Sequence, residues 1–250
     1  MQTDGTTTGL SGRPALRGPL PAPGGHGPFQ EKHRLGAWTV EVRSEAGNRN
    51  RLEDAWRVVP DAPLGRRSVH VLAVFDGVGG EPHGQEAAWG AADALQRAVE
   101  DAGGIDDVLR RLNHIVQGTG GSTTAVVVFL DPRDPCGGGV ASIGDSALYT
   151  LDDGGHLVRL TAKDSLGPML TACLGNDAAR GHVLPLQIGD DAPLLLCTDG
   201  VDGVVGTEGL EMLMQTPPGA REAALDVLFD TIREAGMPDN ATLILAYRGP

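Results

Sequence analysis

The sequence predicts an α+β fold in which two antiparallel β-sheets pack face to face and helices cover their outer faces. Nine short runs rich in Val, Leu, Ile and Thr have the length of strands, and three segments repeat apolar residues with the period of a helix. Short turns rich in Gly and Asp, such as the one in TLDDGGHLV, join consecutive runs and favour antiparallel pairing. Two sheets enclosed by helices would bury all of these elements.

The beginning of the chain differs from the rest in composition. Residues 1–36 are dense in Gly, Pro and Thr, show no regular apolar period, and are predicted to form a flexible tail. Residues 37–250 are predicted to form one domain, because a chain of this length can build a sizeable core without division.

Strands and helices are expected to alternate along this domain. Strands are expected at 38–42, 55–59, 69–75, 123–130, 140–143, 147–151, 182–188, 193–198 and 241–247. Helices are expected where apolar residues fall on one face, at about 84–101, 108–116 and 225–235. The order is therefore strands, two helices, several strands, a helical stretch and a final strand.

Composition and charge argue against several classes of function. A formal net charge of -13 would repel a polyphosphate backbone, so we expect no nucleic-acid partner. The longest apolar runs are far too short to cross a membrane, and the first residues lack the apolar core of a secretory signal. The three cysteines, at 136, 173 and 197, show no spacing typical of a disulfide framework or a zinc ribbon. We therefore expect a cytoplasmic, monomeric protein without membrane contacts.

Carboxylates stand at the ends of several predicted strands. They are Asp76, Asp145 and Asp199 after apolar runs, Asp239 before the final run, and Glu53 and Asp54 before the run AWRVV. A sandwich can bring these ends to one rim, where the negative charges repel each other unless a hard cation neutralises them. Magnesium and manganese suit oxygen ligands, and two such ions can activate water for phosphoryl transfer. A single Asp-Gly after a strand is more often a turn, so spacing alone leaves a turn and a metal site both open.

Seven short blocks follow one another along the chain in a specific order. They are GNRNRLEDAW (47–56), VFDGVGG (74–80), GSTTAVVVF (121–129), ASIGDSALYTL (141–151), LTAKDS (160–165), LLLCTDGVDGVV (194–205) and PDNATLILA (238–246). In this order they resemble the signature motifs of the type-2C metal-dependent serine/threonine protein phosphatases of the PPM family, in their bacterial form. The resemblance covers roughly residues 38–248. It implies a four-layer αββα sandwich and a binuclear magnesium or manganese centre that activates a water molecule.

The resemblance also implies which residues hold the ions. Asp76 would bridge both ions, and the backbone carbonyl of Gly77 would ligate one of them. Asp199 and Asp239 would serve the first ion, and Glu53 would serve the second.

Three further residues receive roles from the same motifs. Asp54 would hold a water molecule at the ions, Asp145 a third and weaker ion, and Arg49 two oxygens of the substrate phosphate. The implied activity is hydrolysis of phosphoserine and phosphothreonine in signalling proteins, with a Ser/Thr kinase or its targets as the partner. Two alternatives stay open: a catalytically weak relative that binds a kinase as a regulatory module, and a phosphatase of small metabolites.

The chain departs from the family pattern at several positions. Leu52 replaces a usual Asn, Val78 replaces a usual His or Met, and Ala147 replaces an Arg that often follows the G-D-S block. The acid that protonates the leaving group is therefore unassigned, since His83 is best explained as a surface or turn histidine. Only LGPM separates LTAKDS from LTACLGN, where bacterial relatives usually have a longer flap. We expect an open cleft that discriminates weakly among phosphopeptides or leaves recognition to a partner.

Overall fold

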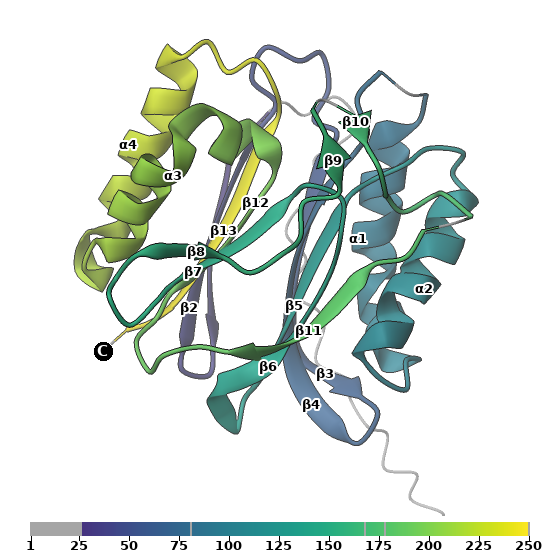
Figure 1. The fold of residues 1–250 in the computed structure, drawn as a ribbon, viewed down its shortest axis with the longest axis horizontal. Coiled ribbons are helices and arrows are strands. Elements are labelled where there is room, and N and C mark those ends of the chain that lie inside the picture. The colour runs from purple at the N-terminus through teal and green to yellow at the C-terminus, as the bar shows by residue number, and fades with distance from the viewer. Residues whose placement is uncertain (1–26, 81, 168, 178, 250) are drawn as a thin grey trace, which may run out of the picture.

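The chain folds into two β-sheets packed face to face between two pairs of helices (Figure 1). The structure is a computed structural model that describes residues 27–80, 82–167, 169–177 and 179–249. Helices α1 (Gly84–Glu100) and α2 (Ile105–Gln117) cover one sheet, and α3 (Asp199–Gln215) and α4 (Arg221–Glu234) cover the other. The predicted αββα sandwich is confirmed. None of the helices in the described residues combines the length and the apolar character needed to cross a membrane.

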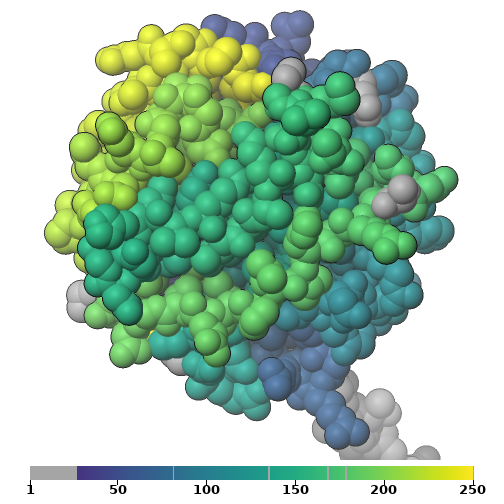
Figure 2. Space-filling model, viewed as in Figure 1, coloured from purple at the N-terminus to yellow at the C-terminus, as the bar shows by residue number. Residues whose placement is uncertain are grey.

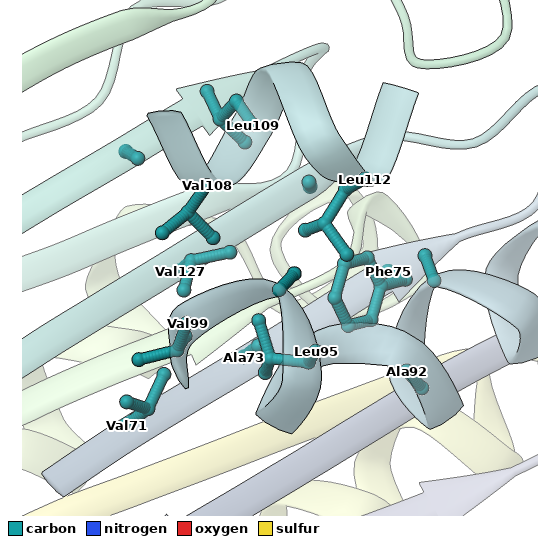
Figure 3. Packing of buried hydrophobic residues seen from close by; sticks show 14 of the residues in the cluster. Val71, Ala73, Phe75, Ala92, Leu95, Val99, Val108, Leu109, Leu112 and Val127 are labelled. Atoms are coloured by element: carbon teal, nitrogen blue, oxygen red, sulfur yellow. The ribbon is translucent and has the colours of Figure 1, made fainter. Parts of the chain in front are cut away.

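The sheet beneath α1 and α2 has five strands in the order β11-β6-β5-β4-β3, all antiparallel to their neighbours. These strands are β3 (Asp54–Leu64), β4 (Arg67–Asp76), β5 (Ala125–Asp131), β6 (Asp134–Ile143) and β11 (His182–Gln187). Side chains of β4 alternate between two cores, as the pleat requires. Val71, Ala73 and Phe75 point toward the helices (Figure 3), whereas Leu72 and Val74 point toward the other sheet.

The second sheet has six strands in the order β1-β2-β13-β12-β7-β8. They are β1 (Phe29–Leu35), β2 (Trp38–Glu45), β7 (Ala147–Leu151), β8 (Leu157–Arg159), β12 (Leu194–Cys197) and β13 (Ala241–Arg248). A separate small hairpin pairs β9 (Ser165–Leu166) with β10 (Met169–Leu170), and a short 3-10 turn, Pro218–Ala220, precedes α4. Figure 2 shows residues from the middle of the chain crossing one face of the molecule between the two helix-covered sides.

The apolar core is divided into three layers. One lies between the first sheet and α1 and α2, one between the two sheets, and one between the second sheet and α3 and α4. Most strands are therefore covered on both faces, which explains why they are nearly continuous apolar runs. Phe75 and Phe129 are almost completely buried, and each such side chain contributes roughly 1.5–3 kcal/mol relative to exposure.

The predicted tail of residues 1–36 is too long at its C-terminal end. Phe29–Leu35 forms β1, which pairs with β2 across a tight turn at Gly36, where φ is 57°. The strand lies at the edge of its sheet, and its side chains alternate between partly buried and exposed. Its sequence FQEKHRL is polar for that reason and does not show the apolar run by which strands were predicted. Residues 1–26 of the predicted tail lie outside the described residues.

Helix α3 was not predicted as a separate element. Its sequence contains glycines at 200, 203, 206 and 209, which lower helix propensity, and the helix is kinked at Gly206 (φ 65°). Packing against the second sheet stabilises it, because Val201, Leu210 and Met214 are buried there. Gly200 permits the close approach of the first turn to the residue that precedes β13, since a Cβ at this position would overlap the carbonyl oxygen of Asn240.

Candidate active site

One cavity of about 770 Å³ is lined by residues from both sheets at the same rim of the sandwich. The predicted site residues that line it are Arg49, Glu53, Asp76, Gly77, Asp145, Asp199 and Asp239. Asp54 is not in the lining; its side chain lies behind this surface and the residue is only 1% exposed. The structure therefore brings together seven of the eight predicted residues and places the eighth as a buried neighbour.

Asp76 stands at the end of β4, where three hydrogen bonds fix its backbone. Its N–H donates to Thr124 Oγ1 (3.0 Å), and its carbonyl oxygen accepts from Thr124 N–H (2.8 Å) and Thr123 Oγ1 (2.9 Å). Asp54 stands directly opposite Asp76 in the β3–β4 register. The adjacent Gly77 N–H donates to the Glu53 carbonyl oxygen at 3.2 Å. These contacts bring together three predicted metal ligands, Glu53, Asp76 and Gly77, at the end of the β3–β4 pair.

The carboxyl group of Asp54 is buried with only part of its hydrogen-bonding capacity used. Oδ2 accepts from Thr198 Oγ1 at 2.8 Å, whereas Oδ1 has no hydrogen-bond partner among the described residues. Burial raises the pKa of Asp54 to about 7, the nearby hydroxyl groups of Thr242 and Thr198 oppose the rise, and the charge of Asp199 adds to it. A buried carboxylate oxygen without a donor indicates negative charge that protein groups do not compensate.

Two other carboxyl groups show the same effect. Burial raises the pKa of Asp76 well above its usual value, and the charges of Asp54 and Asp199 raise it further. Burial also raises the pKa of Asp199, to about 6, and Asp145 and Asp239 add to that rise. The carboxylates therefore share one electrostatic field in which each disfavours ionisation of the others.

The glycines after Asp76 let the backbone pass against the start of α1. A Cβ on Gly77 would overlap the carbonyl oxygen of Gly84, and a Cβ on Gly84 would lie 2.7 Å from the carbonyl oxygen of Val78. Gly79 faces the cavity instead, where a Cβ would lie 3.5 Å from Arg49 Nη1. The stretch VFDGVGG is therefore the end of a strand that carries Asp76, followed by glycines whose backbone atoms line the cavity.

Arg49 is paired with another predicted site residue. Its Nη2 donates to Asp239 Oδ2 at 2.6 Å and its Nε donates to the Pro238 carbonyl oxygen at 3.0 Å. The side chains of Arg49 and Asp239 are 44% and 41% exposed, so water competes for both. The predicted phosphate-binding group and a predicted metal ligand thus satisfy each other, and each must leave the pair to take its predicted role.

Asn240 is a site residue that the sequence motifs did not reveal. Its Oδ1 accepts from Glu53 N–H at 2.7 Å, and its Nδ2 donates to the carbonyl oxygens of Ala46 (2.8 Å) and Arg51 (2.9 Å). Residue 240 is only 4% exposed. The amide therefore ties the loop that carries Arg49 to the start of β13. The only sequence signal was its place beside Asp239 in the PDNATLILA block.

The donor set of the cavity suits hard divalent cations. Its groups are carboxylate oxygens and a backbone carbonyl, the ligands that magnesium and manganese prefer. The free Oδ1 of Asp54 and the raised pKa of Asp76 both point to negative charge that a cation would neutralise. The side chains do not converge on one point, because no three His, Cys, Asp or Glu residues of the described ranges are grouped closely enough to hold an ion. The chemistry fits a metal centre, and the side chains would have to close around it.

No imidazole lines the cavity among the described residues. Val78 occupies the wall, as the sequence indicated. His83 lies at the start of α1 with its side chain 55% exposed, 3.8 Å from Glu86. It is therefore a surface histidine, in line with the sequence, and it does not line the cavity.

The short flap forms the β9–β10 hairpin at the edge of the cavity. Met169 and Leu170 line the cavity together with Cys173 and Asn176. Leu166 and Met169 are paired across the hairpin and are 78% and 68% exposed. The flap thus adds an apolar, water-exposed border to a cavity that is otherwise acidic.

Three solved structures share this architecture. The Mycobacterium tuberculosis serine/threonine phosphatase PstP/Ppp matches with a TM-score of 0.70 and 22% identity, over 85% of this chain and 99% of that chain. Stp1 from Staphylococcus aureus matches with a TM-score of 0.72 and 19% identity, over 89% and 98%. The catalytic domain of PstP in complex with two manganese ions matches with a TM-score of 0.69 and 22% identity, over 84% and 97%. No protein-family model and no curated protein matches the chain. At these identities the comparison establishes the architecture: the chain has the fold of the bacterial serine/threonine phosphatases.

Proposed function

We propose that the protein is a metal-dependent phosphatase of phosphoserine and phosphothreonine in proteins. The observation that carries this proposal is the cavity that carboxylates from five separate segments line together with an arginine. The shared fold supports it, as do the two manganese ions in the complex of the PstP catalytic domain. The order of the seven sequence blocks adds independent support.

Two manganese or magnesium ions would be held by Glu53, Asp76, the carbonyl of Gly77, Asp199 and Asp239, and a third ion by Asp145. When bound, the ions would supply Lewis-acid activation of the phosphate and a lowered pKa for the attacking water. Their charge would also keep the crowded carboxylates ionised, against the burial that now raises the pKa of Asp76 and Asp199.

Arg49 would bind two oxygens of the substrate phosphate. Its guanidinium is planar and 44% exposed at the cavity, so a phosphate dianion can compete for it against the single carboxylate of Asp239. Release of Asp239 from Arg49 would free that carboxylate for an ion. Substrate binding and completion of the ligand set would therefore favour each other.

Asp54 would orient the attacking water. Its Oδ1 is the acceptor without a partner among the described residues, while Thr198 holds Oδ2 in place. With its pKa at about 7, the group can exchange a proton near neutral pH. Its burial behind the cavity keeps it from competing for the ions with the carboxylates that line the cavity.

The flap hairpin supports a polypeptide substrate. Met169 and Leu170 border the cavity with apolar surface that a small phosphorylated metabolite would leave uncovered. Side chains beside a phosphorylated residue can cover this border. With only two short strands, such a flap would contact few substrate positions, in line with the weak discrimination expected from its length.

The test compares phosphothreonine, phosphoserine and phosphotyrosine peptides with p-nitrophenyl phosphate, with manganese and with a chelator. The wild-type protein should hydrolyse the first two peptides only with metal, and Asp199→Asn should abolish this activity. Asp153→Asn, which removes an exposed carboxylate outside the cavity, is the matched control. Full activity of Asp199→Asn would refute the assignment. Manganese binding without turnover of any substrate would favour the regulatory module, and turnover of small esters alone would favour a metabolite phosphatase.

A further inference from the structure

Arg159, the last residue of β8, lies behind the loop that carries Asp145. Its Nη2 donates to the carbonyl oxygens of Asp145 (2.6 Å) and Ser146 (3.3 Å), and its Nε donates to the carbonyl oxygen of Thr161 (3.2 Å). Only 22% of the side chain is exposed. Hydrogen bonds from a guanidinium are stronger than those between neutral groups, so this loop is firmly held to β8.

The same guanidinium also reaches the first turn of α3. Its Nη1 lies 3.5 Å from Asp202 Oδ2, and the Tyr149 hydroxyl donates to that oxygen at 2.8 Å. The guanidinium lies 5.8 Å from the centre of the Tyr149 ring. Asp202 follows Asp199 by three residues, so the two side chains lie on one side of the helix. Arg159 therefore joins two segments that carry predicted ligands.

The position of this cation is determined by the β7–β8 hairpin. Arg159 stands directly opposite Tyr149 in the register of the two strands. Ala147, which follows the G-D-S block, is completely buried and too small to reach Asp202. The guanidinium at this junction therefore comes from β8, twelve residues further along the chain. Lys163 adds a second positive charge, which acts on Asp202 less strongly than Arg159 does.

We propose that Arg159 is a positioning residue that fixes the Asp145 loop and the first turn of α3, so that Asp145 and Asp199 face the cavity. The proposal rests on the proposed function, because these carboxylates are the ones assigned to the ions. Without Arg159, the carbonyl oxygens of Asp145, Ser146 and Thr161 lose a donor. Asp202 keeps the Tyr149 hydroxyl and the charge of Lys163 but loses the cation that acts on it most strongly, close to Asp145 and Asp199. Repulsion among the three carboxylates would then displace the loop.

The first test measures manganese affinity by titration calorimetry on protein stripped of metal. Arg159→Ala should weaken binding by about 10-fold or more, the range for residues that orient metal ligands. The manganese affinity of Arg159→Lys should lie between those of wild type and Arg159→Ala. A lysine keeps the charge but lacks the planar fork that reaches several acceptors. Arg97→Ala is the matched control, since that side chain is 89% exposed and, among the described residues, its one ion pair is with Asp101 at the end of α1.

The second test needs no metal. Hydrogen exchange of residues 144–147 and 199–203 in the stripped protein should be faster in Arg159→Ala than in wild type, with exchange in α1 unchanged. Unaltered exchange in these segments together with wild-type manganese affinity would overturn the proposal. If Arg159→Ala does not fold, Arg159→Lys and Tyr149→Phe carry both measurements, and wild-type values in both variants would count equally against it. Failure of the wild-type protein to bind manganese would refute the proposed function, while the exchange result would still decide the role of Arg159.

Discussion

The buried Asp54 should make the stability of the metal-free protein depend on pH. Burial raises its pKa from 3.8 to about 7. A carboxyl group whose pKa is higher in the folded than in the unfolded state binds its proton more tightly when folded. Its contribution to the free energy of unfolding is therefore full at low pH and is lost as the pH rises through about 7.

The magnitude follows from the size of the shift. The pKa rises by about three units, and each unit corresponds to ~1.4 kcal/mol. Between about pH 5 and pH 8, folded Asp54 changes from mostly protonated to ionised, while the unfolded group is ionised throughout. The free energy of unfolding should fall by roughly 2–3 kcal/mol over this range because of Asp54 alone. Asp54→Asn removes the titration but keeps a hydrogen-bond acceptor toward Thr198.

Urea denaturation at several pH values, with a chelator present, measures this difference. The fall in stability with pH should be smaller in Asp54→Asn than in wild type by the amount given above. The exposed-site variant Asp153→Asn should behave like wild type. Manganese should restore the stability of the wild-type protein at about pH 8, since a bound cation favours the ionised carboxylates. The reasoning is refuted if wild type and Asp54→Asn show the same dependence, or if the stability of the metal-free wild type rises with pH.

Two further substitutions test the loop that carries Arg49. Arg49→Ala should raise the KM for a phosphothreonine peptide about 10-fold or more, because the substrate phosphate loses its guanidinium partner. Manganese binding should not weaken, because Asp239 loses its competing partner. Kinetics measures the KM and calorimetry the manganese affinity, and an unchanged KM would contradict the phosphate role. Asn240→Ala should lower the free energy of unfolding by about 2–3 kcal/mol, because the Glu53 N–H and two loop carbonyl oxygens lose their buried hydrogen-bond partner. Chemical denaturation measures the loss, and a value below roughly 0.5 kcal/mol would show that water replaces the amide.

The strands of both sheets were predictable because most are covered on two faces. Segments such as Ala125–Asp131 and Ala241–Arg248 are continuous apolar runs for that reason. Strand β1 escaped prediction because an edge strand with one exposed face carries polar residues. Helix α3 escaped because tertiary packing overrides the low helix propensity of its glycines. Local patterns therefore identified the buried strands and missed elements whose stability comes from their neighbours.

The site was predictable where a residue type at a strand end carries the information. Asp76 and Asp199 end apolar runs, and their gathering in one cavity follows from the packing of the two sheets. Asn240 and Arg159 were not predictable, because their contacts are set by the tertiary structure. Asn240 binds backbone groups about 190 residues away in the chain, and Arg159 reaches Asp202 on a helix that no pattern had indicated.

The division of the carboxylates between the two sheets has a consequence for how the protein folds. Asp54 and Asp76 meet within the β3–β4 hairpin, which forms from neighbouring residues. Asp199 and Asp239 flank strands of the other sheet and reach the cavity only after that sheet has paired and docked. A chain with only one sheet formed would hold half of the proposed ligands. Under the proposed assignment, the capacity to bind ions would therefore arise only when the two sheets have docked, and manganese uptake by a refolding sample would report that step.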